Sequence, residues 1–256
     1  MTDDRSLEFE IEVPGTPEEV WQAIATGPGI TSWYVPHTVT ESEGGAASSS
    51  FGPGPEMTVP GRVAAWDPPK RVVFTGEGGD DVGLAFEWLV EARDGGSCVV
   101  RLVNTGFGTG DTWDEQYDGM SRGWPMFLTN LLLHREHFPG RHATASIPMG
   151  VWPGKVDDAW ERLTDDLGID PAPAVGDAVE LATDGAPTIA GTVKETTAAR
   201  LSLVIEQPVP GTAIVTAEQM GDVVGVSLWL YLYGDEREAA ATAHQEAWGA
   251  WLAARA

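Results

Sequence analysis

The sequence contains a single cysteine, Cys98, in 256 residues. This excludes an internal disulfide, and so few thiols fit a reducing compartment. No stretch of about 20 apolar residues occurs, and no basic flank precedes an apolar run at the N-terminus. We therefore expect a cytoplasmic protein without a membrane-spanning segment.

Basic residues are scarce: 15 Lys and Arg stand against 39 Asp and Glu, for a net charge of −24. Nucleic acids and anionic membranes bind through clusters of Lys and Arg, so we expect neither as a partner. The acidity is explained by solubility, with a basic protein partner as the alternative reading.

Motifs for catalysis and metal binding are also missing. The sequence has no HExxH, no Cys/His zinc spacing and no GxSxG, and the glycines of GFGTGD (106–111) lack the lysine of a phosphate loop. The acidic pairs Glu18/Glu19 and Asp157/Asp158 open helices, where they favour the positive end of the helix dipole. We therefore expect no catalytic residue, no metal and no cofactor.

The sequence does contain an internal repeat. PGTPEEVWQAI (14–24) has the capping box and early proline of a helix start, and PGKVDDAWERL (153–163) resembles it. At a constant shift of 139, five residues match: Pro14, Gly15, Trp21, Gly29 and Ile30 correspond to Pro153, Gly154, Trp160, Gly168 and Ile169. We interpret the chain as two copies of one unit.

Each copy is predicted to contain a strand, a helix, several antiparallel strands and a closing helix. In the first copy the strands are 7–13, 57–66, 70–76, 83–92 and 97–105, with loops at 44–56 and 76–81 and a closing helix at 111–138. In the second copy a strand at 144–151 and a helix at 154–167 precede five strand-like runs and an alanine-rich helix from Asp235.

The helix at 111–138 carries one apolar stripe, formed by Tyr117, Met120, Trp124, Phe127, Leu131 and His134. Pro125 is expected to bend it. Alternation along the strands places the following side chains on the face that meets this stripe: Val72, Phe74, Leu84, Phe86, Trp88, Val90, Cys98, Val100, Leu102 and Asn104. A cavity between helix and sheet follows if these side chains leave space.

Four segments carry a family resemblance: GITSWYVP, GRVAAWDPPKRVVFTGEG, LAFEWLVEARDGGSCVVRLVNTGFG and GWPMFLTNLLL. Their order and spacing resemble the activator-of-Hsp90-ATPase-like branch of the START-like (SRPBCC) helix-grip superfamily, over about residues 7–138. The resemblance implies an α+β fold in which a curved antiparallel sheet wraps a long C-terminal helix around a hydrophobic cavity. We expect tandem units of this kind, residues 1–140 and a second, degenerate copy at 141–256.

The cavity of the first unit is the expected binding site for a small apolar or aromatic molecule. Its candidate residues are Trp33, Phe74, Phe86, Trp88, Asn104, Tyr117, Met120, Trp124, Leu131 and His134. Whether these side chains fill the space or leave room for a ligand is open at this point, as is whether His134 is structural or orients a ligand.

Two alternatives to a binding protein remain. A polyketide cyclase or aromatase would need polar groups in the cavity, for which Asn104, Tyr117 and His134 are the candidates. A protein-interaction module, such as a partner of an Hsp90-type chaperone, would instead need an exposed patch. The second unit, with Trp248, Trp251 and Leu252 on its last helix, is expected to be structural.

Overall fold

The computed structural model describes residues 5–52, 54–78 and 82–256. The chain divides into two compact units, one ending at His142 and the other beginning at Ala143. Each unit is built around its own antiparallel sheet, and each is described here by itself.

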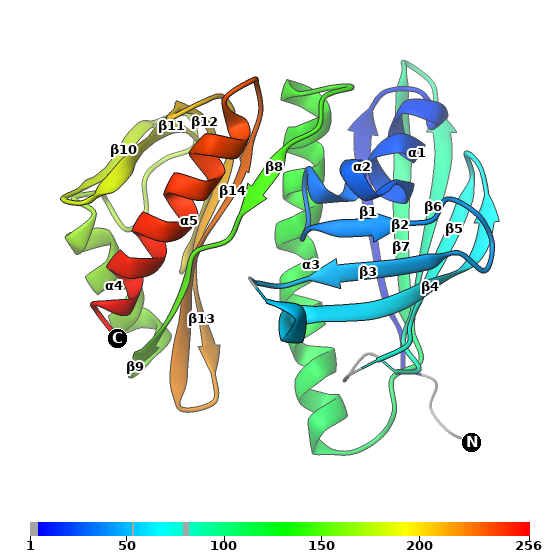
Figure 1. Ribbon diagram of the computed structural model, residues 1–256, viewed down its shortest axis with the longest axis horizontal. Coiled ribbons are helices and arrows are strands. Elements are labelled where there is room, and N and C mark those ends of the chain that lie inside the picture. Colours follow the sequence, from blue (N-terminus) through cyan, green and yellow to red (C-terminus); the bar gives the residue numbers. More distant parts are fainter. Residues whose placement is uncertain (1–4, 53, 79–81) are drawn as a thin grey trace. The chain divides into compact units, whose positions relative to one another are not determined.

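The first unit wraps a curved sheet around one long helix (Figure 1). Its elements are β1 (Leu7–Pro14), α1 (Pro17–Ala25), α2 (Gly27–Thr31), β2 (His37–Val39), β3 (Ala46–Ser50), a 3₁₀ turn (Pro55–Met57), β4 (Thr58–Asp67), β5 (Arg71–Gly76), β6 (Ala85–Arg93), β7 (Ser97–Thr105) and α3 (Asp111–His137). The described strands pair in the order β1-β7-β6-β5-β4-β3-β2. The first strand therefore pairs with the last, and β2 forms the opposite edge.

Local sequence explains how the chain turns from β1 into α1. Gly15 has φ +125°, a backbone conformation that side chains disfavour, and its amide donates to the Gly96 carbonyl at 2.9 Å. Thr16 then caps α1, because its hydroxyl accepts from the Glu19 amide at 3.3 Å while the Glu19 carboxylate accepts from the Thr16 amide at 3.0 Å. This reciprocal capping box starts the helix where the sequence predicts it.

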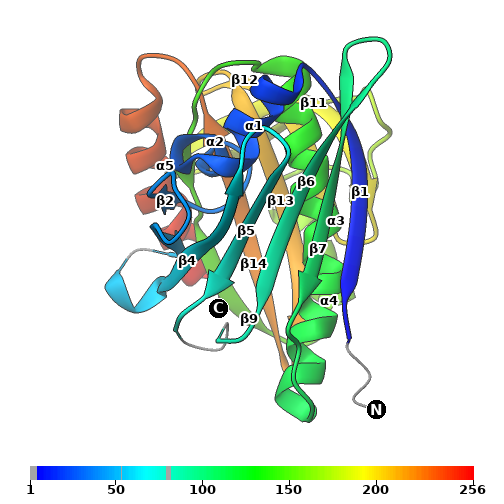
Figure 2. The same ribbon diagram turned by 90° about the vertical axis from the view of Figure 1, so that its right-hand side faces the viewer.

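Helix α3 runs along the concave face of the sheet, as Figure 2 shows. Hydrogen bonds join it to the residue before β1 and to the last residue of β1. Near its start the Tyr117 hydroxyl donates to the Ser6 carbonyl at 3.3 Å, and near its end Arg135 Nε donates to the Pro14 carbonyl at 3.2 Å. The helix continues through Pro125. Two hydrogen bonds at opposite ends thus fix how the helix lies over the sheet.

The strand register places apolar side chains in rows beneath α3. Phe74, Phe86, Asn104 and Leu7 are direct partners across β5, β6, β7 and β1. Direct partners in an antiparallel sheet point to the same face. The next such row joins Val72, Trp88, Leu102 and Phe9.

The second unit repeats this topology. Its elements are β8 (Thr144–Ser146), β9 (Met149–Pro153), α4 (Val156–Asp166), β10 (Ala178–Thr183), β11 (Ala186–Thr197), β12 (Arg200–Gln207), β13 (Gly211–Met220), β14 (Val223–Leu232) and α5 (Arg237–Ala253). The strands pair in the order β10-β11-β12-β13-β14-β8, and β9 also pairs with β14. The split first strand β8–β9 therefore pairs with the last strand, as β1 does in the first unit.

The matched helix starts occupy equivalent places in the two units. Pro14 pairs with Ser97, the first residue of β7, and Pro153 pairs with Val223, the first residue of β14. Trp21 on α1 and Trp160 on α4 are each 4% exposed. The two tryptophans predicted to be equivalent thus lie at matching points of the same topology.

The side chains facing α4 and α5 form one dense apolar core. It includes Trp152, Trp160, Leu163, Leu181, Ile189, Leu203, Val226, Leu230, Trp248 and Leu252. Trp248 and Leu252 lie on one stripe of α5 and are fully buried. The second unit therefore has an extensive apolar core beneath its closing helix.

The predicted fold class, tandem α+β helix-grip units, is confirmed, and the closing helix of the first unit lies at 111–137 as expected. Residues 44–56, predicted as loop or hairpin connection, contain strand β3, and β2 was also missed. The single strand predicted at 144–151 is two short strands, β8 and β9. Residues 79–81 of the predicted turn at 76–81 lie outside the described residues.

Candidate ligand pocket

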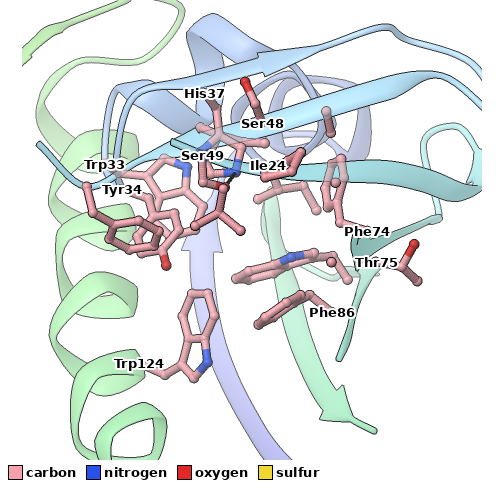
Figure 3. A pocket seen from close by; sticks show the side chains of 18 residues that line it. Ile24, Trp33, Tyr34, His37, Ser48, Ser49, Phe74, Thr75, Phe86 and Trp124 are labelled. Atoms are coloured by element: carbon pink, nitrogen blue, oxygen red, sulfur yellow. Dashed lines mark hydrogen bonds between the residues drawn. The ribbon is translucent and has the colours of Figure 1, made fainter. Parts of the chain in front are cut away.

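A pocket opens in the first unit between α2, strands β2–β6 and helix α3 (Figure 3). Its lining residues are Ile24, Ile30, Trp33, Tyr34, His37, Ala47, Ser48, Ser49, Phe51, Val59, Pro60, Gly61, Phe74, Thr75, Gly76, Phe86, Trp88 and Trp124. None of them carries a formal charge at neutral pH, so the lining suits an uncharged guest.

Seven of the eighteen lining residues are Trp, Tyr or Phe, and the ring of Trp88 packs edge to face against those of Trp33 and Trp124. Trp88 lies 5.6 Å from both Trp33 and Trp124, measured between ring centroids, and Trp124 lies 5.2 Å from Tyr34. Trp33 is further fixed by its indole N–H, which donates to the Ala23 carbonyl at 2.9 Å. These contacts hold the rings in a preformed arrangement.

The open space is small. The cavity measures about 70 Å³ and is partly open to solvent, whereas pockets for drug-sized molecules measure roughly 300–1,000 Å³. An apolar cavity of about 150 Å³ suffices for benzene. The open space is therefore smaller than a benzene-sized cavity, and a single-ring molecule would need the wall to move slightly or would extend through the mouth.

His37 and Ser49 form a hydrogen-bonded pair on the pocket wall. They are direct partners across β2 and β3, and Ser49 Oγ lies 2.9 Å from His37 Nε2. The other ring nitrogen, Nδ1, lies 3.0 Å from the Val35 carbonyl. A carbonyl only accepts, so Nδ1 carries the proton, Nε2 accepts, and the Ser49 hydroxyl donates to it.

This pair has the connectivity of an activated nucleophile: a hydroxyl, a base and a group that orients the base. Burial lowers the pKa of His37 to about 4. The ring is therefore neutral at pH 7 and a weak base, below the pKa near the working pH that suits general-base catalysis.

Two buried polar atoms near Phe86 have no hydrogen-bond partner among the described residues: Trp124 Nε1 and Asn104 Oδ1. Trp124 is 5% exposed and Asn104 is fully buried. Phe86 is the cross-strand partner of Asn104, and the centroid of its ring lies 6.0 Å from that of the Trp124 ring.

The structure brings half of the sequence-predicted site residues together at this pocket. Trp33, Phe74, Phe86, Trp88 and Trp124 line it. The other five, Asn104, Tyr117, Met120, Leu131 and His134, lie outside its lining.

Those five residues have other surroundings. Tyr117 and Met120 pack with Phe86 on a cluster of Leu7, Leu84 and Phe107. Leu131 is fully buried. His134 is 2% exposed, and burial, with smaller contributions from Arg135 and His142, lowers its pKa to about 3.

The sequence reading missed the polar wall of the pocket, His37, Ser48 and Ser49, together with Tyr34 and Phe51. Gly- and Ser-rich sequence is typical of loops, so the sequence pattern does not predict strand β3. The residues of GITSWYVP gave the only signal for Tyr34, through the family resemblance.

Metal binding and membrane spanning have no support in the part of the chain that the structure describes. There, no three His, Cys, Asp or Glu side chains are grouped so as to hold a metal ion. Within the same described residues, no helix is long and apolar enough to cross a membrane.

Comparison with known families gives a match for the first unit. Residues 14–133 match the family described as activator of Hsp90 ATPase homolog 1-like protein. These residues include the whole pocket lining and every element of the first unit except most of β1 and the last residues of α3. The first unit is therefore similar to that family, in agreement with the resemblance predicted from the sequence.

Among solved structures, the protein MLL2253 from Mesorhizobium loti is 20% identical, with a TM-score of 0.46, and the match covers 52% of this chain and 98% of that one. DynU16, from the dynemicin biosynthetic locus, is 16% identical over 98% of this chain and 97% of its own, with a TM-score of 0.45. BexL, a di-domain ARO/CYC from the BE-7585A biosynthetic pathway, is 13% identical over 96% and 92%, also with a TM-score of 0.45. A comparison with curated proteins gives no match.

Proposed function

We propose that the first unit binds a small, flat, uncharged and mainly apolar molecule in the pocket between α2, β2–β6 and α3. The observation that carries this proposal is the wall of aromatic rings around an uncharged space that opens to solvent. Burying apolar surface of the ligand there contributes about 25 cal/mol per Å² to the free energy of binding. A preformed wall reduces the ordering cost of binding.

The small volume of the pocket defines the class of guest. At about 70 Å³ the cavity favours a single ring or the flat end of a larger molecule that extends through the mouth. The extensive apolar core of the second unit supports a structural role for that half.

A pocket-filling substitution tests this proposal. Ala47 lies on β3 in the pocket lining and is 9% exposed, so Ala47→Leu places a larger side chain in the open space. Ala64→Leu is the matched control, because Ala64 is exposed on the neighbouring strand β4.

Native mass spectrometry of the freshly purified chain is the readout, with added toluene as a single-ring probe if no molecule co-purifies. We expect a bound small molecule in the wild type and in Ala64→Leu, and none in Ala47→Leu. Equal loading of all three chains would place binding elsewhere. An empty wild type that also fails to take up toluene would instead favour a protein-interaction role, as in the Hsp90 ATPase activation of the family's description.

Acyl transfer is a second candidate function, favoured by the hydrogen bond between Ser49 and His37. In such a reaction the Ser49 oxygen would attack an aryl ester and His37 would take its proton, releasing a phenol and leaving an acyl group for water to remove. The low pKa of His37 weakens this candidate. With 4-nitrophenyl acetate, release of 4-nitrophenol that disappears in Ser49→Ala would support it, whereas equal rates in both chains would exclude it.

A further inference from the structure

The hydrogen bond between Ser49 and His37 on the pocket wall has a fixed direction (Figure 3). The other ring nitrogen of His37, Nδ1, lies 3.0 Å from the Val35 carbonyl, which only accepts. Burial keeps the ring neutral at pH 7, because it lowers the pKa of His37 to about 4. The single proton of the neutral ring is therefore on Nδ1, and Nε2 accepts the proton of the Ser49 hydroxyl.

This direction leaves the Ser49 oxygen as an acceptor. A hydroxyl group has one proton and two lone pairs, and the proton of Ser49 is occupied by His37. In the part of the chain that the structure describes, no group donates to Ser49 Oγ. Ser49 lines the pocket and is half-buried. A ligand in the pocket therefore meets an oxygen that can accept a hydrogen bond and cannot donate one.

We propose that Ser49, with its hydroxyl oriented by His37, selects ring compounds that carry an N–H donor, such as pyrroles and indoles, over rings whose heteroatom only accepts. The proposal rests on the pocket being a ligand site. The ring of the ligand lies among the aromatic side chains, and its N–H donates to Ser49 Oγ. A ligand without a donor would cover this oxygen and leave its lone pairs unpaired, which is unfavourable.

Other polar groups suit this wall less well. An ether or carbonyl oxygen has lone pairs only, which would face those of Ser49. An ammonium or guanidinium group adds a positive charge, and the described residues that line the pocket include no Asp or Glu to compensate it. A neutral N–H on an aromatic ring supplies the donor without a charge, and a small flat ring suits a cavity of about 70 Å³.

Five-membered rings of similar size test this selection. Pyrrole has the N–H, furan has an oxygen in its place, and N-methylpyrrole has its nitrogen blocked. We expect the full-length protein, titrated by ligand-observed NMR at pH 7, to bind pyrrole about fivefold more tightly than furan, a factor that corresponds to one neutral hydrogen bond. N-methylpyrrole should bind no more tightly than furan.

Two variants assign the preference to its residues. Ser49→Ala removes the acceptor, and we expect the preference for pyrrole to fall to about twofold or less. His37→Phe releases the Ser49 proton, so that Ser49 can also donate to furan, and the preference should fall in the same way. Ser49→Ala keeps the test decisive if His37→Phe does not fold.

Ser50→Ala is the matched control. Ser50 follows Ser49 on β3, its hydroxyl donates to the Gly52 carbonyl at 3.0 Å, and it lies outside the pocket lining. The same loss of a hydroxyl, one residue along the strand, should leave the preference for pyrrole unchanged.

The ¹⁵N shifts of the histidine rings give a second measurement, which needs no ligand. At pH 7 the ring of His37, identified by the signals that disappear in His37→Phe, should carry its proton on Nδ1. A proton on Nε2 would make Ser49 the acceptor of His37 and free its hydroxyl to donate, which would overturn the proposal.

The outcomes distinguish this inference from the binding proposal. Equal affinity for pyrrole and furan would overturn the selection by Ser49 and leave the pocket as an apolar site. A preference that survives in Ser49→Ala, or that disappears in Ser50→Ala, would also overturn it. If neither these rings nor toluene bind up to their solubility, the binding proposal fails and this inference fails with it.

Discussion

Two buried histidines, His134 and His244, and the half-buried His37 show how single residues make this fold sensitive to acid. Burial is the main cause that lowers the pKa of His37 to about 4, of His134 to about 3 and of His244 to about 4. Each pKa lies below the ordinary 6.5, so the unfolded chain binds more protons than the folded chain between that value and the lowered one. Stability is therefore full near neutral pH and is lost as the pH falls from about 6.5 towards 4.

His244 gives the clearest test of this effect. It is fully buried on α5, and neither ring nitrogen has a partner among the described residues. We expect His244→Leu to unfold at an equal or higher denaturant concentration at pH 7. Between pH 6.5 and 4 it should lose roughly 2–3 kcal/mol less than the wild type, because no proton can be taken up at this position. Urea titrations at several pH values measure this, and identical pH profiles would refute it.

The sequence predicts which face a side chain lies on where a single helical or strand periodicity determines that face. Trp124 follows from the helical stripe, and Phe86 and Asn104 follow from alternation. His37 and Ser49 could not be predicted, because their hydrogen bond depends on the pairing of β2 with β3. Leu131 and His134 share the stripe with Trp124, yet they lie outside the pocket because the pocket meets only one part of α3.

At the scale of elements, the repeated helix starts differ in how they are capped. Thr16 and Glu19 form a complete capping box, whereas the side chain of Lys155, at the corresponding position of α4, does not cap the helix. Both helices have two acidic residues in the first turn. The second copy has thus kept the dipole interaction and lost the cap.

Opposite substitutions test this difference. Thr16→Ala should lower the free energy of unfolding by about 1 kcal/mol, because the Glu19 amide loses its acceptor. Lys155→Ser should raise it by a few tenths to about 1 kcal/mol by supplying the missing acceptor. Thermal and urea unfolding of the two variants provide the measurement. A stabilising Thr16→Ala, or a clearly destabilising Lys155→Ser, would contradict the capping argument.

Elements with a strong pattern were predictable and elements without one were not. The run SCVVRLVNT coincides with β7, because its alternation is unbroken. AASSS has small, mostly polar residues, which are typical of loops, yet pairing with both β2 and β4 makes it strand β3. Tertiary pairing overrides local composition there.

At the scale of the whole molecule, each unit has its own sheet and closing helix, and the division falls after His142. A sequence that repeats one unit predicts that each copy can fold alone. The fragment 1–142 should therefore show cooperative unfolding and bind toluene as the full chain does. Circular dichroism during thermal unfolding tests this. A fragment that is unfolded on its own would mean that the two halves share a core.

The most direct test of the central claim, that the pocket of the first unit holds a ligand, is the set of indole N–H signals in a ¹H–¹⁵N NMR spectrum. The chain has 11 tryptophans, and substitution of each by Phe assigns its signal. On adding toluene, the signals of Trp33, Trp88 and Trp124 should shift, since these three side chains line the pocket. Those of Trp160, Trp248 and Trp251 should remain in place. Shifts confined to the tryptophans of the second unit, or none at saturating ligand, would contradict the account.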